Sequence, residues 1–76
     1  MHKHGIKILE SVRPEIWTSR LKILARMSCV GFRNQELETL ALMQKLVSDE
    51  YLEVVHETED PLYLITDKGI KMLSQI

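Results

Sequence analysis

The chain has 76 residues, of which 45% are hydrophobic and 28% charged. This length and composition predict one globular domain over residues 1–76 and exclude a second domain. The formal net charge of −1 neither favours nor disfavours nucleic acid, and no apolar run approaches the ~20 residues of a membrane-spanning helix. Cys29 is the only cysteine, which excludes an internal disulfide and is typical of a reducing compartment. The expected location is therefore the cytoplasm.

The charges are unevenly distributed along the chain. Residues 1–33 carry a net charge of +5, whereas residues 34–76 carry −6. Such asymmetry is a sign of a basic binding face. The alternative is that folding intermixes the two sets of charges, so that no basic patch forms.

The first predicted element is a helix from His4 to Val12, where isoleucine, leucine and valine recur at helical spacing. Pro14 disfavours a helical conformation at the residue before it and is suited to the first turn of a new helix. We expect His2 and His4 to belong to a flexible terminus.

Two interpretations remain open for residues 14–27. In the first, the whole stretch is a second helix, and Trp17 lies in the core because leucines follow it at helical spacing. In the second, residues 15–17 form a short strand, and Thr18 or Ser19 caps a shorter helix.

Residues 28–33 contain a glycine and are predicted to form a turn. Asn34 is a good N-cap residue, so the third helix is expected to run from it to about Ser48. Apolar side chains cover more than one face of this segment. The helix is therefore expected to be buried on several sides or to form an interface.

The C-terminal part predicts a β-hairpin and a last helix. Residues 51–55 and 62–66 are rich in strand-forming side chains and flank a short acidic loop. Thr66 or Asp67 can cap a helix over residues 68–75. The predicted fold class is thus α+β, mostly α, with three helices, a two-stranded wing and a C-terminal helix.

This order of elements resembles the winged helix-turn-helix. Residues 46–55 are similar to the passage from a recognition helix into the first wing strand, although many members have glycine at the position of Glu50. Residues 63–73 resemble the "tyrosine, leucine, threonine, lysine-glycine, leucine" stretch that closes the wing in MarR-like, PadR-like and related archaeal and phage regulators. The resemblance implies a sequence-specific transcription regulator that binds double-stranded DNA, and a homodimer would double its footprint.

In DNA-binding members of this group the third helix lies in the major groove. Arginine pairs well with guanine, and asparagine or glutamine with adenine. The base-reading residues that the resemblance implies are Arg33, Asn34 and Gln35. The residues expected to neutralise phosphates are Arg20, Lys22, Arg26 and Lys45.

Other features favour an alternative function. The wing tip is acidic, and a phosphate backbone would repel it. Acidic residues also lie in the first turn of the third helix. Leu37, Leu40 and Ala41 occupy positions of this helix at which DNA-binding members usually have polar side chains. The alternative is a protein-binding winged helix, either an adaptor or a virally encoded inhibitor without DNA affinity.

The sequence offers no site for catalysis, a cofactor or a metal. The three histidines are too scattered for a zinc site, which needs close pairs of ligands. No glycine-rich phosphate loop is present. Cys29 has no base partner in the sequence pattern and is expected to be a buried, small apolar residue. We therefore expect a binding module and not an enzyme.

Overall fold

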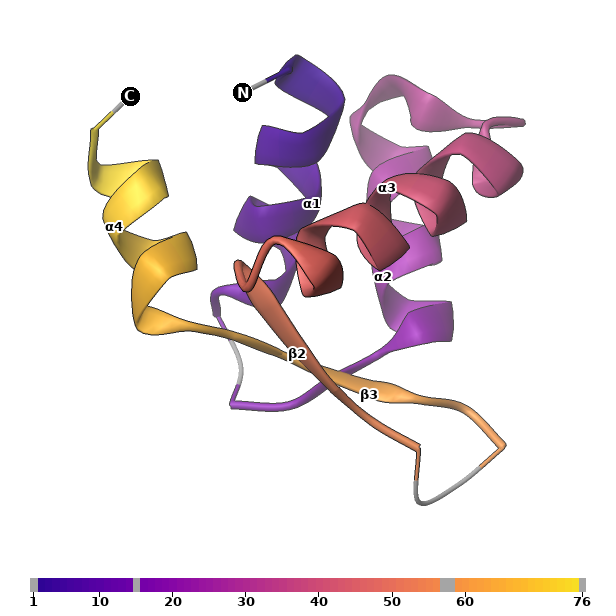
Figure 1. Ribbon diagram of the computed structural model, residues 1–76. Helices are drawn as coiled ribbons and strands as arrows, with labels where there is room; N and C mark the ends of the chain where they lie inside the picture. Colours follow the sequence, from indigo (N-terminus) through magenta and orange to yellow (C-terminus); the bar gives the residue numbers. More distant parts are fainter. Residues whose placement is uncertain (1, 15, 57–58, 76) are drawn as a thin grey trace.

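The computed structural model describes residues 2–14, 16–56 and 59–75 (Figure 1). In chain order the elements are α1 (Lys3–Val12), β1 (Thr18–Ser19), α2 (Arg20–Met27), a wide helical turn η1 (Ser28–Phe32), α3 (Glu36–Ser48), β2 (Leu52–Val55), β3 (Leu62–Ile65) and α4 (Asp67–Ser74). The fold is α+β and mostly helical, as the sequence predicted.

Helix α1 forms the centre of the structure. It contacts α2, α3, α4 and β3, and its Ile8, Leu9 and Val12 are completely buried. The helix begins at Lys3, one residue before the predicted start. The prediction that His4 belongs to a flexible terminus was wrong, because His4 is buried within α1. Within the described residues, no helix is both long and apolar enough to cross a bilayer.

Helix α2 begins at Arg20, so the prediction of one helix over residues 14–27 was wrong. The hydroxyl of Ser19 accepts a hydrogen bond from the Lys22 amide at 3.2 Å and caps the helix, as the second interpretation expected. The preceding strand lies at Thr18 and Ser19, after the predicted position. Trp17 therefore lies outside the helix and is 41% exposed, which corrects its expected place in the core.

The turn between α2 and α3 contains two residues with positive φ. Gly31 has φ 104° and Asn34 has φ 65°, within the left-handed region that these two residue types tolerate. The N-cap of α3 is Gln35, and its side chain makes no capping bond. The prediction that Asn34 caps α3 was therefore wrong: this asparagine serves the turn instead.

The sheet has three antiparallel strands in the order β1-β3-β2, one more than the predicted two-stranded wing. Thr18 pairs with Tyr63, and Val54 pairs with the same tyrosine from the other side. The amide of Arg20 also donates to the carbonyl of Pro61 at 2.9 Å. Strand β1 thus attaches the wing to the start of α2.

The core lies between the helices and one face of the sheet. Its side chains come from every helix before the wing and from both wing strands. They are Ile8, Leu9, Val12, Ile23, Met27, Met43, Leu46, Leu52, Tyr63 and Ile65.

Helix α4 packs tightly against the start of the wing. Thr66 caps it by accepting from the Gly69 amide at 3.1 Å, and the Thr66 hydroxyl donates to the Glu50 carbonyl at 2.6 Å. The ammonium of Lys68 lies 4.7 Å from the centroid of the Tyr51 ring. A Cβ atom on Gly69 would lie only 2.5 Å from the Tyr51 carbonyl oxygen, so only glycine permits this approach.

We predict that Gly69→Ala destabilises the protein. Alanine would favour a helix by up to about 1 kcal/mol, but the backbone clash resembles overpacking, which costs about 1–3 kcal/mol. Urea denaturation of Gly69→Ala should show a lower free energy of unfolding, whereas Lys71→Ala on the exposed side of α4 should stay within about 0.5 kcal/mol of wild type. Equal stability of Gly69→Ala and wild type would contradict the close approach.

Glu50 adopts the left-handed backbone conformation, with φ 68°, although it is neither glycine nor asparagine. Glu50→Gly should raise the free energy of unfolding by about 0.5–1 kcal/mol, since glycine adopts this conformation without strain. Asn34→Gly is the matched control and should gain less, because asparagine already tolerates the left-handed region. Denaturation midpoints of the two variants test this order, and a loss of stability in Glu50→Gly would contradict it.

Candidate nucleic-acid interface

A groove of about 570 Å³ runs between α3 and the wing. It is formed by the exposed side of α3, the first residue of α2 and the facing parts of the hairpin. The residues that line it are Arg20, Leu37, Leu40, Ala41, Gln44, Val47, Val54, His56, Pro61 and Tyr63.

The α3 side of the groove follows helical spacing. Leu37, Ala41 and Gln44 are exposed and lie at i, i+4 and i+7, so they share one face of the helix. Leu37 is 80% exposed, which is exceptional for leucine. This face of α3 lines the groove, and it presents two apolar side chains and one amide.

The polar groups of the groove gather at its wing side. Burial raises the pKa of the Tyr63 hydroxyl, while the nearby charge of Arg20 opposes this shift and Asp60 adds to it. Arg20 is the lysine or arginine among the described residues that line this groove. His56 lines the same groove from the exposed end of the wing. His56 belongs to no motif in the sequence, and the motif that begins at Tyr63 indicated the fold and not a place in this groove.

The three predicted base-reading residues precede α3, with Arg33 and Asn34 in the turn and Gln35 at the N-cap. Arg33 and Asn34 are exposed, and Gln35 is half-buried. The Gln35 amide donates to the Phe32 carbonyl at 3.3 Å, and its carbonyl accepts from Thr39 at 2.9 Å. None of the three lines the groove between α3 and the wing.

The predicted phosphate-binding residues do not lie on one surface. Lys22 and Arg26 line a separate groove between α1 and α2, whereas Arg20 lines the one beside the wing. The guanidinium of Arg26 donates to the carbonyl of Ser11. Arg26 therefore supports the end of α1.

Lys45 lies on yet another side of α3. It lines a cavity with Leu42 and Asp49 from its own helix and with Tyr51 and Met72. Gln44 faces the groove beside the wing, and one helical residue turns the next side chain by about 100°. Of the four predicted cations, the structure brings only Arg20 to the groove.

The acidic wing tip has a structural role at one position. The carboxylate of Asp60 accepts a hydrogen bond from the Leu21 amide in the first turn of α2, at 3.3 Å. A carboxylate at a helix N-terminus is favourable, because it meets unpaired amides and the positive end of the helix dipole. Glu59 is exposed, while Glu57 lies outside the described residues. Part of the acidity of the wing therefore stabilises α2.

His4 holds the start of α3 against α1. Its Nε2 is hydrogen-bonded to Oγ1 of Thr39 at 2.8 Å, and its ring stacks on Phe32 with centroids 4.2 Å apart. Burial lowers the pKa of His4, the charge of His2 lowers it further, and Glu38 opposes both. This contact was missed, because a histidine near the end of the chain carries no signal of burial.

Cys29 is exposed, which corrects the expectation that it is buried. It lies in η1, and its side chain lines the groove between α1 and α2. Among the described residues, no three histidine, cysteine, aspartate or glutamate side chains gather in a way that could hold a metal ion.

The lowered pKa of His4 predicts that stability falls in mild acid. The unfolded chain binds a proton near pH 6.5, whereas folded His4 remains neutral to a lower pH. The stabilisation is therefore complete above pH 6.5 and is lost as the pH falls toward the folded pKa. Chemical denaturation between pH 7.5 and 5.5 should show a smaller loss in His4→Gln than in wild type. Equal losses would show that another group is responsible.

Solved structures have the same arrangement of elements. The chain superposes on BpsR of Bordetella bronchiseptica with a TM-score of 0.83 at 13% identity, covering 99% of this chain and 51% of that chain. It superposes on RosR of H. salinarum with a TM-score of 0.89 at 16% identity, covering 99% and 69%. The BpsR structure describes how 6-hydroxynicotinic acid regulates its DNA binding.

The chain thus spans about half the length of BpsR and about two thirds of RosR. No family model matches the chain, and no curated protein matches it in sequence. The likeness confirms the resemblance expected from the sequence: the chain has the winged helix-turn-helix fold of these regulators.

Proposed function

We propose that the protein is a transcription regulator that binds double-stranded DNA through α3 and the wing. The observation that carries this proposal is the groove between α3 and the wing, which Arg20 and Gln44 line; Arg33 and Asn34 are exposed in the turn that leads into α3. The likeness to BpsR, whose DNA binding is regulated, supports it. The protein acts as a binding module in the cytoplasm, and it catalyses no reaction.

In this proposal α3 enters the major groove with its N-terminal end. Arg33 reads guanine, and Asn34 and Gln35 read adenine, because their donors and acceptors match those base edges. Arg20 neutralises a phosphate beside the wing. Gln44 lies about one helical turn after Ala41, and both side chains line the groove. Gln44 therefore extends the contact along the helix.

The remaining predicted cations contribute less in this proposal. Lys22 and Lys45 lie outside the groove and add only a general attraction to DNA. Arg26 acts on α1 through the Ser11 carbonyl. A homodimer would compensate for so few contacts, because two copies double the footprint and fix the spacing of half-sites.

The exposed Leu37 favours a second candidate function. An 80% exposed leucine beside Ala41 is an unusual recognition surface for DNA, whereas apolar side chains in a groove are typical anchors for a protein partner. In this alternative the same groove holds an apolar segment of another protein, and the domain has no DNA affinity.

Fluorescence anisotropy with random duplex DNA across a salt series tests both candidates. We expect binding that weakens linearly with the logarithm of salt concentration, with a slope that reports the number of neutralised phosphates. No binding even at low salt would contradict the DNA proposal and favour the protein-binding alternative.

Two variants test the assigned face. On a specific duplex selected from a random pool, Arg33→Ala should weaken binding by about 1–3 kcal/mol, and Arg20→Ala should reduce the salt slope by about one contact. Lys71→Ala on α4 is the matched control and should leave both quantities unchanged. Wild-type binding by the Arg33 and Arg20 variants would show that DNA is bound elsewhere.

A further inference from the structure

The sheet has a second face that the fold leaves uncovered. Thr18, Tyr63 and Ile65 are buried on the core side. Side chains alternate along a strand, so Leu62 and Leu64 point to the opposite side, and Trp17, the residue before β1, is exposed next to them in the chain's path into the sheet. In Figure 1 the helices lie on one side of the sheet, and no helix formed by the described residues lies on the other.

This outer sheet face is apolar at its centre. We define it as Trp17, Val55, Leu62 and Leu64, together with Glu53. Val55 and Leu62 are cross-strand partners, and Glu53 is the partner of Leu64. The three aliphatic side chains are half-buried, and Trp17 is 41% exposed. Adjacent apolar side chains on an open sheet face are a sign of an interaction surface.

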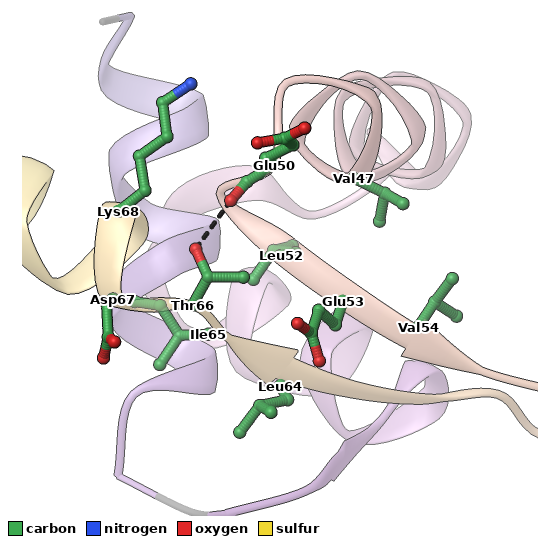
Figure 2. Close-up of a pocket in the computed structure, with 10 residues that line it drawn as sticks. All are labelled: Val47, Glu50, Leu52, Glu53, Val54, Leu64, Ile65, Thr66, Asp67 and Lys68. Carbon is green, nitrogen blue, oxygen red and sulfur yellow. Dashed lines mark hydrogen bonds between the residues drawn. The ribbon is translucent and has the colours of Figure 1, made fainter.

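The charges at this face are acidic. Glu53, Leu64 and Asp67 line one pocket, in which Glu50 is a further carboxylate and Lys68 the cation (Figure 2). Glu53 and Asp67 are both exposed. The described strands, residues 18–19, 52–55 and 62–65, contain no lysine or arginine. An apolar centre with carboxylates at its margin is therefore complementary to a basic, amphipathic segment.

We propose that the outer sheet face docks a basic, amphipathic peptide segment of a partner protein. Apolar side chains of the segment cover Trp17, Leu62 and Leu64, and its lysines or arginines pair with Glu53 and Asp67. A second copy in a two-fold arrangement would place one acidic face against another. A nucleic acid would bring phosphates to the same carboxylates. The charge thus favours a cationic protein segment over both.

This surface differs from the groove beside α3 in most of the side chains that form it. Val54 lines that groove, whereas its neighbours Glu53 and Val55 belong to the outer sheet face. The inference goes beyond the proposed function, and it can be tested without DNA.

Trp17 provides the readout, because it is the only tryptophan in the chain. The probe is a short synthetic peptide in which leucine and lysine alternate, and its counterpart alternates leucine and glutamate. We expect the leucine–lysine peptide to shift Trp17 emission to shorter wavelength and to protect it from acrylamide quenching. The leucine–glutamate peptide should do neither.

Charge reversal at Glu53 distinguishes docking at the outer sheet face from general electrostatic attraction between the peptide and the protein. Glu53→Lys should weaken binding of the leucine–lysine peptide at least about tenfold, since it replaces a pairing by a like-charge contact. Glu36→Lys makes the same change of charge on α3 and should weaken binding by less than about twofold. If Glu53→Lys does not fold by circular dichroism, Glu53→Gln replaces it.

Three outcomes would overturn the proposal. The first is equal weakening by the Glu53 and Glu36 variants, which would show unspecific attraction. The second is equal protection of Trp17 by both peptides, which would show apolar adsorption without charge selection. The third is protection of Trp17 by rising protein concentration alone, which would assign the face to a second copy of the chain.

Discussion

The pairing of β1 with β3 is the constraint on which the candidate interface depends. Two residues, Thr18 and Ser19, join the wing to the helices, and the bond from the Arg20 amide to the Pro61 carbonyl extends this attachment. Because α2 starts directly after the strand, the pairing determines where Arg20 lies. It also determines that the wing faces α3 across a groove. Besides this short strand, the hairpin is held by its core side chains Leu52, Tyr63 and Ile65 and by the hydrogen bond from the Leu21 amide to Asp60.

The same pairing creates the two faces of the sheet. Thr18 is buried with Tyr63 on the core side, and its neighbour Trp17 is therefore turned outward. One small element thus positions a cation in the groove and exposes an aromatic side chain on the opposite surface. We propose that DNA binds at the groove between α3 and the wing, and that a protein partner binds at the outer sheet face. A regulator with both surfaces could connect a DNA site to another protein.

Most of the fold was predictable, because hydrophobic spacing is a local signal. The segments now seen as α1, α3, β2, β3 and α4 were predicted with small shifts of their ends, and the cap of α4 is Thr66, one of the two residues expected to serve there. Trp17 was misplaced in the first interpretation because helical spacing ignores pairing with a distant strand. Asn34 suits both a cap and a left-handed turn, and only the tertiary path of the chain decides between them.

The candidate site was less predictable, because it depends on which side of a helix faces which neighbour. Arg20 and Lys22 are two residues apart in sequence, yet they line different grooves. Arg26 is engaged by a carbonyl of α1, which no charge pattern reveals. His4 gave no sequence signal at all, although it connects α1 to Thr39 of α3.

Mapping DNA contacts on the isotope-labelled protein by two-dimensional NMR tests the central claim most directly. If α3 and the wing bind DNA, duplex DNA shifts the amide signals of residues 33–44 and of the facing wing, while those of α4 remain unchanged. Shifts confined to α1 or α4, or no shifts at low salt, would contradict the claim that α3 and the wing form a nucleic-acid interface.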